Sequence, residues 1–326
     1  MQTSCGSWMR ACKRDKINIL CSPTHERFES VFGEIDANFY AIKTPETKDW
    51  NQQYSRQPDN YHIYNSTHLP YHVKFDLVLS QNKFGQFQYL ARIARIMGLP
   101  LVSIEHTCPM PFWSQDQMKQ LRQMEANINV FISDWSVDAW GFSDSRNVRV
   151  VEHCVDTNTF SPSSFKRTNQ ILTVANDYIG RDYCLNFKQY MRITQGLKTM
   201  PVGDTPNFSK PSKDINELVN FYRTSRVFLN TAHLSPIPTS LLEAMSCECA
   251  VVSCKTCAIP SYIKHGETGF LYETDQEARY YLELLMKDEK LATRIGKNAR
   301  QSILKKCSKN RFVNEYNKIF QETILT

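Results

Sequence analysis

Short apolar runs, typical of buried strands, recur along the first half of the chain. They cover residues 17–21, 75–79, 101–104, 129–132 and 148–151. Residues 86–97 instead repeat apolar side chains at helical spacing and stop at Gly98, so we expect a helix there. Residues 41–70 are polar with little periodicity, which predicts irregular surface structure. Short apolar strands that alternate with helices indicate parallel βαβ units.

A second series of the same kind begins after residues 160–162. We predict strands at residues 171–174, 199–202, 226–229 and 250–252, and helices at residues 218–224, 240–247, 275–287, 289–305 and 310–324. The last helix places its apolar residues on one stripe, which is typical of a helix packed on another surface. Because 326 residues exceed the comfortable size of one hydrophobic core, we expect two α/β domains.

The composition is that of a globular protein, with 41% hydrophobic and 22% charged residues. The net charge of +6 is spread along the chain, and no run of Lys and Arg forms a nucleic-acid footprint. A mild positive excess still suits an acidic small ligand such as a nucleotide diphosphate.

The chain shows no targeting or membrane signal that we recognise. No stretch reaches the ~20 apolar residues that span a bilayer, and residues 1–16 lack the apolar segment of a signal peptide. We therefore expect no transmembrane segment and a cytoplasmic protein, with its 11 cysteines as reduced thiols. Cys247, Cys249, Cys254 and Cys257 crowd together, but an apolar strand separates the pairs and no His stands at zinc-ligand spacing. We expect no metal site.

Three segments carry a family resemblance. The longest is SPIPTSLLEAMSCECAVVSCKTCAIPSYIKHGETGF, from Ser235 to Phe270; HCVDTNTFSP begins at His153, and LPLVSIEH ends at His106. In their order along the chain and in their spacing, these three segments resemble the retaining glycosyltransferases of family 4. The resemblance implies the GT-B architecture, in which two Rossmann-like domains with parallel sheets face each other.

The pattern and the resemblance together predict the domain limits. These are a flexible lead-in over residues 1–15, an acceptor-side domain over 16–152, a linker over 153–168, a nucleotide-sugar-binding domain over 169–308, and a helix over 309–326 that packs back toward the first domain. The resemblance implies transfer of a sugar from a nucleotide-sugar donor to an acceptor hydroxyl with retention of anomeric configuration. The acceptor would be a glycan, a lipid-linked molecule or another hydroxyl compound.

The charges that develop in this reaction point to the residues that would bind the donor phosphates. Cleavage of the anomeric bond leaves positive charge on the sugar and negative charge on the phosphate, and the site must stabilise both. A helix that starts near Ser240 supplies unpaired N–H groups for phosphate, and Ile237 and Thr239 present further ones. Arg181 and Lys188 resemble the family's cationic pair; the alternative, particularly for Lys188, is a solvated surface charge. No Asp-x-Asp is placed at the donor site, so we expect metal-independent chemistry and no cofactor.

The resemblance is strong at one acidic position and broken at another. Glu243 stands at the family's second Glu, which implies a contact with the ribose hydroxyls. The alternative is a capping box, in which Ser240 caps the helix and Glu243 bonds the amide of the cap. Eight positions earlier, Ser235 replaces the family's first Glu, and a hydroxyl cannot stabilise an oxocarbenium ion by charge. Pro236 and Pro238 each remove one backbone N–H that would otherwise be available to phosphate.

The turn at Gly203 and Asp204 resembles a family segment that lines the donor site. The path from this turn to Leu218 is short, which indicates that a strand-helix unit of the family is trimmed here. His106 matches the family's His that approaches the donor sugar; the alternative is a structural His at a strand end.

The segment after the first strand lies where an acceptor would approach. It carries His25, Glu26 and Arg27. We expect these side chains on the acceptor side, while the alternative is that Glu26 and Arg27 pair with each other at the surface.

Two other functions stay open. Compact transferases of this general fold occur in viruses, where some glycosylate modified bases in DNA and would work in the host cytoplasm; the absence of a Lys/Arg stripe disfavours DNA as the partner. The other is a sugar-nucleotide-binding protein without catalysis, because Ser235 stands where the family has an acid.

Overall fold

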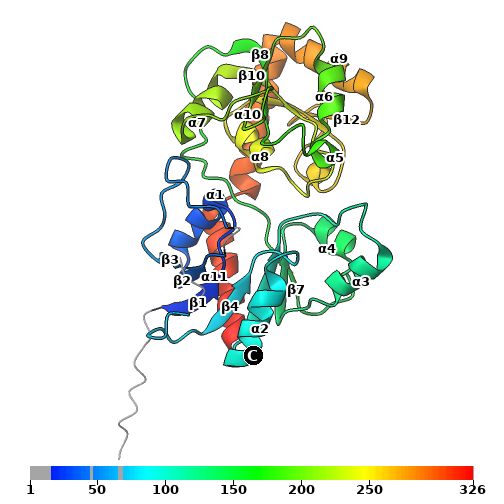
Figure 1. Ribbon diagram of the computed structural model, residues 1–326. Coiled ribbons are helices and arrows are strands. Elements are labelled where there is room, and N and C mark those ends of the chain that lie inside the picture. The colour runs from blue at the N-terminus through cyan, green and yellow to red at the C-terminus, as the bar shows by residue number, and fades with distance from the viewer. Residues whose placement is uncertain (1–15, 45–46, 65–68, 326) are drawn as a thin grey trace, which may run out of the picture.

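Two parallel sheets, one in each half of the chain, form the framework of the protein. The computed structural model describes residues 16–44, 47–64 and 69–325, so the lead-in predicted for residues 1–15 lies outside the described residues. One sheet has seven strands and the other five, and each forms its own lobe (Figure 1).

The sheet of the first half has the strand order β3-β2-β1-β4-β5-β6-β7, with every pairing parallel. Its strands are β1 (Ile17–Cys21), β2 (Ala37–Ile42), β3 (Tyr61–Tyr64), β4 (Leu77–Ser80), β5 (Leu101–Glu105), β6 (Ile128–Phe131) and β7 (Val148–Val150). The order reverses between β1 and β4, and such a switch point opens a crevice at the carboxyl ends of the strands. The loops after β1, β4 and β5 border that crevice.

Five short helices connect these strands: α1 (Glu26–Glu29), η1 (Ser30–Glu34), α2 (Phe87–Met97), α3 (Gln115–Arg122) and α4 (Asp134–Trp140). The irregular structure predicted for residues 41–70 is wrong at β3, where Tyr61 is buried and pairs with Phe39 across the sheet. β3 is a four-residue edge strand with only one fully buried side chain, so it leaves no apolar run in the sequence.

The sheet of the second half has the order β12-β11-β10-β8-β9, again parallel throughout. Its strands are β8 (Thr168–Val174), β9 (Thr199–Val202), β10 (Ser225–Asn230), β11 (Ala250–Cys254) and β12 (Phe270–Tyr272). The helices are α5 (Asp182–Leu185), α6 (Phe187–Thr194), α7 (Ile215–Thr224), α8 (Thr239–Ser246), η2 (Ile259–Ser261), α9 (Asp275–Lys287) and α10 (Glu289–Lys306). Within the described chain β9 is an edge strand, and α7 is the only helix between β9 and β10. This agrees with the short path from Gly203 to Leu218, from which we expected a strand-helix unit to be missing.

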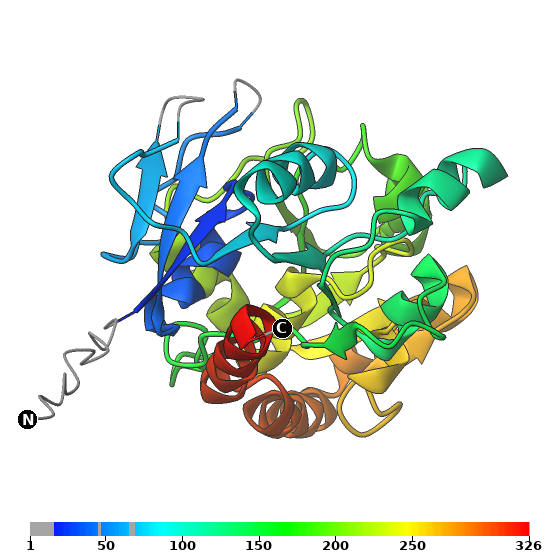
Figure 2. The same cartoon turned by 90° about the horizontal axis from the view of Figure 1, so that it is seen from below.

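The last helix, α11 (Lys309–Leu325), returns to the first half. It contacts η1, β4 and β5, and it buries Phe312, Tyr316 and Phe320 in the same apolar core as Phe32 and Phe39. Figures 1 and 2 show this red helix beside elements of the first lobe. The two parallel sheets and the returning C-terminal helix confirm the predicted fold class. We propose that residues 153–168, which run from beyond β7 to the first residue of β8, are the linker.

Candidate functional site

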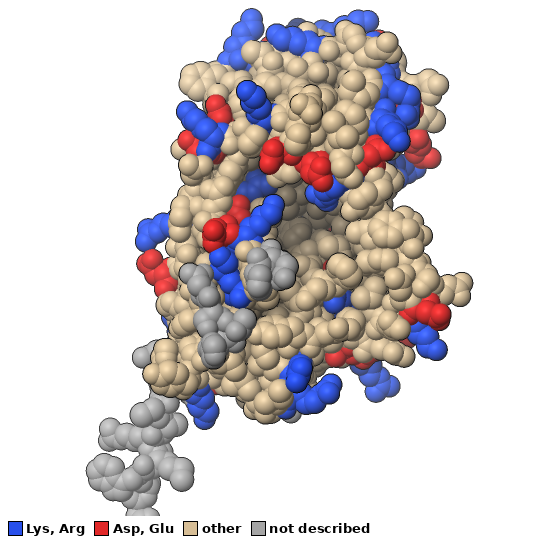
Figure 3. All heavy atoms as spheres, in the orientation of Figure 1, with Lys and Arg blue, Asp and Glu red and all other residues tan. Residues whose placement is uncertain are grey.

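A cavity of about 870 Å³ lies between the two halves. Figure 3 shows the hollow between the upper and lower lobes. Loops at the carboxyl ends of strands from both sheets line it, and they contribute among others Thr24 after β1, Asn82 after β4, His106 after β5, Asn176 after β8 and Thr231 after β10. Ligands of α/β proteins bind at these edges, so this cavity is the candidate site.

The N-terminus of α8 opens into this cavity. Ser235, Ile237, Thr239 and Ser240 all line it. The helix begins at Thr239 after Pro238, whose φ of −67° already suits a helix start, and no side chain caps it. The backbone N–H groups of the first turn therefore point toward a ligand space, which favours an anion there.

Glu243 lies in the second turn of α8 and is only 5% exposed. Its Oε1 is 2.5 Å from Nη1 of Arg27, and its Oε2 accepts a hydrogen bond from the Tyr222 hydroxyl at 2.9 Å. Burial raises the pKa of Glu243, while Arg27 and the Tyr222 hydrogen bond oppose that rise. The carboxylate therefore faces the Arg27 guanidinium and the Tyr222 hydroxyl rather than solvent.

These contacts correct two of the alternative interpretations. The capping box is wrong, because Pro238 starts the helix two residues before Ser240 and the Glu243 carboxylate bonds Arg27 and Tyr222. The surface pairing of Glu26 with Arg27 is also wrong, because α1 directs Arg27 across to α8. His25 and Arg27 line the cavity, whereas Glu26 is not among its lining residues.

His106 and His153 stack at the first-half wall of the cavity. Their ring centroids are 5.7 Å apart with an angle of 9° between the planes, and Phe28 packs edge-on against His106 at 4.5 Å. Burial, followed by neighbouring positive groups, lowers the pKa of His106 well below its usual value and that of His153 to about 4. Burial therefore disfavours the charged form of both imidazoles. The buried Nε2 of His106 has no hydrogen-bond partner among the described residues.

The two predicted phosphate-binding cations are separated by the structure. Arg181 precedes α5 and lines the cavity. Lys188 lies on α6, outside the cavity lining, with an 80% exposed side chain 3.4 Å from Oδ2 of Asp182. The alternative of a solvated surface charge therefore describes Lys188 in this structure.

Gly203 and Asp204 support the cavity from behind rather than lining it. Gly203 has a φ of +131°, and a Cβ there would lie 1.9 Å from the carbonyl oxygen of Ala175, so the turn requires glycine. The amide of Asp204 donates to Oδ1 of Asn176 at 2.9 Å, and Ala175 and Asn176 both line the cavity.

Sequence reasoning missed Glu29, which fixes the loop that carries Thr24 and His25. Its buried carboxylate accepts the backbone N–H groups of both residues at 3.1 Å and the Tyr61 hydroxyl at 2.8 Å, and Gln81 donates to it as well. Burial raises the pKa of Glu29 to about 7 despite these donors. No local motif indicates that Glu29 fixes this loop, because its partners Tyr61 and Gln81 come from distant segments. His153, by contrast, had a signal, because it begins one of the three segments that carry the family resemblance.

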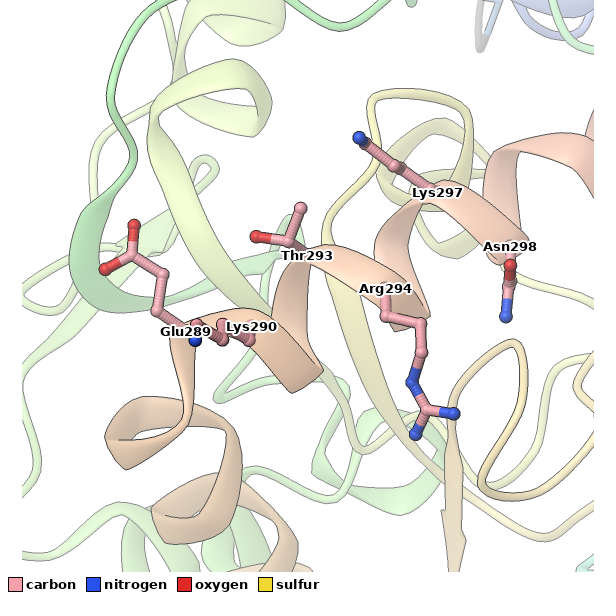
Figure 4. Close-up of a pocket in the computed structure, with 6 residues that line it drawn as sticks. All are labelled: Glu289, Lys290, Thr293, Arg294, Lys297 and Asn298. Atoms are coloured by element: carbon pink, nitrogen blue, oxygen red, sulfur yellow. The ribbon is translucent and has the colours of Figure 1, made fainter.

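A second, shallow hollow lies on the outer face of α10. Figure 4 shows that Lys290, Arg294 and Lys297 project from this one helix, with Glu289, Thr293 and Asn298 beside them. Lys290, Arg294 and Lys297 lie on one helical stripe of solvated charges, and no second element contributes a group there. This surface is not the candidate site.

The described residues hold neither a metal-binding cluster nor a membrane-spanning helix. No group of three or more His, Cys, Asp or Glu side chains in residues 16–44, 47–64 and 69–325 is arranged to hold a metal ion. In the same ranges, no helix combines the length and the apolar character that crossing a membrane requires.

Comparisons with known proteins agree with this geometry. Residues 205–302 match the family described as glycosyl transferases group 1. Among curated proteins, the N-acetyl-alpha-D-glucosaminyl L-malate synthase of Bacillus anthracis is 28% identical over 139 residues, which are 42% of this chain and 35% of that protein. The match therefore spans about a third of that relative's length.

Solved structures resemble the whole chain. Sucrose-phosphate synthase of Thermosynechococcus elongatus has a TM-score of 0.77 at 10% identity, covering 94% of this chain and 99% of that one. Anabaena Alr3699/HepE in complex with UDP has a TM-score of 0.73 at 14% identity, covering 94% and 100%. At these identities the likeness concerns the fold. With the family match over residues 205–302, it confirms the resemblance to the group 1 glycosyltransferases and the GT-B fold that the sequence predicted.

Proposed function

We propose that the protein transfers a sugar from a nucleotide-sugar donor to an acceptor hydroxyl, with retention of the anomeric configuration. The observation that carries this proposal is the cavity between the two sheets, which gathers Glu243, Arg181, Ser235 and His106 around one space. The relative from Bacillus anthracis is named N-acetyl-alpha-D-glucosaminyl L-malate synthase, and the Anabaena structure holds UDP. A UDP-sugar is therefore the first donor class to test.

The nucleotide end of the donor would bind on the second half of the chain. Glu243 would accept hydrogen bonds from the ribose hydroxyls, since a carboxylate has about four acceptor positions and only two are used by Arg27 and Tyr222. Arg181 and the N–H groups that begin α8 would bind the diphosphate and stabilise the charge that develops on it.

The sugar end of the donor would lie between Ser235 and His106. Nε2 of His106, which has no partner among the described residues, would hydrogen-bond a sugar hydroxyl, and Ser235 would do the same from the opposite wall. Because Ser235 carries no charge, the departing phosphate would supply the negative charge that faces the sugar cation and would take the proton of the acceptor. The acceptor would approach along His25 and Arg27.

The test is a thermal-shift screen against UDP-, GDP-, ADP- and CMP-sugars, followed by measurement of nucleotide release. A ligand at 100 times its dissociation constant stabilises a protein by about 2.7 kcal/mol, which such a screen detects readily. Stabilisation by one donor, followed by its consumption when acceptors are added, supports the proposal. If no donor stabilises the protein and none is consumed, the proposal fails.

A second candidate is a sugar-nucleotide-binding protein without catalysis. Ser235 in place of an acid, and Pro236 and Pro238 in place of N–H donors, are the specific observations that favour it. Saturable donor binding by calorimetry, without hydrolysis or transfer to any acceptor, would select this function over the first.

A further inference from the structure

Exposed aromatic side chains stand next in sequence to residues that line the cavity. Phe84 is 70% exposed, Phe112 66% and Tyr183 47%. Each stands within two residues of a residue that lines the cavity: Phe84 follows Asn82, Phe112 follows Met110, and Tyr183 lies between Arg181 and Cys184. Three separate segments from both halves therefore bring exposed rings to one rim. We call Phe84, Phe112, Trp113 and Tyr183 the aromatic rim.

The rings of the aromatic rim contact one another in pairs. The Phe84 and Trp113 centroids are 5.9 Å apart. The Phe112 and Tyr183 centroids are 5.8 Å apart in an edge-to-face arrangement, and this pair joins the two halves of the protein. In Figure 1, α5, which carries Tyr183, faces the lower lobe.

The rim is held in place from behind. Trp113 packs against buried Trp140 at 6.1 Å, and the Trp140 indole N–H donates to the carbonyl of Thr107 at 2.9 Å. Pro109 and Pro111 flank Met110 and restrict the backbone of the loop that carries Phe112 and Trp113. A loop that is already ordered loses little conformational entropy when a ligand binds, so the rim is preorganised.

We propose that the aromatic rim is an acceptor subsite that binds the sugar rings of a glycan acceptor; this deepens the proposed function and rests on it. Isolated exposed apolar residues are ordinary, but a cluster at the mouth of a cavity marks a binding surface. A sugar ring offers an apolar C–H face to an aromatic ring and hydroxyls at its edge. The rim offers separate rings, with the polar Asn82 and Arg181 beside them.

The same geometry distinguishes a glycan from the other acceptors. A small acceptor would fit within the cavity and leave Phe84 and Phe112 uncovered. An alkyl chain would bury best in a continuous apolar groove, whereas the two pairs of rings border a mouth lined by polar groups such as Asn82 and Thr107. A chain of sugars could occupy both the cavity, with one end toward His106, and the aromatic rim.

The test compares wild type with Phe84→Ala, Phe112→Ala and the double variant. Labelled protein with saturating UDP is applied to an array of oligosaccharides, and UDP affinity and the melting temperature are measured separately. Tyr280→Ala is the matched control, because Tyr280 is 62% exposed on α9, away from the cavity lining. We expect wild type and the control to bind a subset of glycans of two or more sugars. The double variant should lose at least tenfold in glycan affinity and keep its UDP affinity within twofold.

Three outcomes overturn the inference. One is equal glycan binding by wild type and the double variant; another is no glycan binding by wild type. The third is binding of wild type to phosphatidylcholine vesicles that carry an alkyl glycoside, in a manner that requires the alkyl chain. Failure of the proposed function looks different, because wild type would then not bind UDP or any nucleotide sugar, whatever the array shows.

Discussion

Nη1 of Arg27 lies 2.5 Å from Oε1 of Glu243, and this ion pair joins α1 of the first half to α8 of the second. The Glu243 side chain is 7% exposed and that of Arg27 21%. Removal of one partner leaves the other charge buried and unpaired, which costs far more than the pair itself contributes. We therefore predict that Arg27→Ala lowers the free energy of unfolding by about 3 kcal/mol, measured by urea denaturation.

A double-mutant cycle checks that the loss comes from this pair. With Glu243→Gln already present, Arg27→Ala should cost clearly less than it does alone, because no buried carboxylate is then left unpaired. Strictly additive effects would show that the two side chains do not interact in solution.

The two cations near α5 should differ in donor binding. Arg181 lines the cavity, while Lys188 faces solvent and pairs with Asp182. Arg181→Ala should weaken binding of UDP, or of the donor nucleotide that the screen identifies, by about tenfold or more, since a charge-assisted contact to phosphate contributes roughly 1.5–3 kcal/mol. Lys188→Ala should change it less than twofold. Titration calorimetry measures the nucleotide affinity of both variants. An equal loss of affinity in both would mean that Lys188 also binds the donor.

Glu243 should govern nucleotide binding through its charge. Glu243→Gln keeps the shape of the side chain but weakens its hydrogen bonds to ribose hydroxyls, so affinity should fall by about tenfold, or 1.4 kcal/mol. The matched control is Glu283→Gln on α9, where the carboxylate pairs with Arg279 on the surface. If both variants bind nucleotide like wild type, Glu243 has no part in ribose binding.

The buried His153 should make stability depend on pH. Its pKa is lowered to about 4 in the folded protein, while an unfolded His titrates near about 6.5. Between these values the unfolded state binds a proton that the folded state does not, so stability falls as the pH drops from 6.5 to 4. His153→Asn removes this term, which amounts to about 3 kcal/mol over the full window.

The measurement is the free energy of unfolding of both proteins from pH 7 to pH 4. The wild-type curve should fall relative to that of His153→Asn as the pH decreases. Curves that stay parallel across this window would mean that His153 titrates normally in the folded protein.

Burial on both faces makes a strand easy to predict from the sequence. In β10 and β11 every residue is buried, so the apolar run is continuous and marks the strand directly. β3 has one fully buried residue among four and lies at the sheet edge. Its register with β2 depends on partners far along the chain, and no local pattern encodes that.

In the candidate site too, the residues of one local segment could be predicted from the sequence, whereas a contact between distant segments could not. Ser235, Ile237, Thr239 and Ser240 lie on one short segment, so a local motif was enough to place them together in the cavity. The pairing of Arg27 with Glu243 joins residues 216 positions apart and depends on how the two halves face each other.

The position of Lys188 outside the cavity lining also could not be predicted from the local sequence. Lys188 is only seven positions after Arg181, but the break between α5 and α6 turns it to the outside. Residue type and spacing alone do not reveal that change of direction.

The most direct test of the account is to follow nucleotide release from the donor selected by the thermal-shift screen, in wild type and in Glu243→Gln. We predict that wild type consumes the donor to free nucleotide, faster with an acceptor present, and that the product keeps the donor's anomeric configuration by NMR. Glu243→Gln should lose most of this activity at donor concentrations that saturate wild type. Tight donor binding by wild type without consumption, or a product of inverted configuration, would contradict the account.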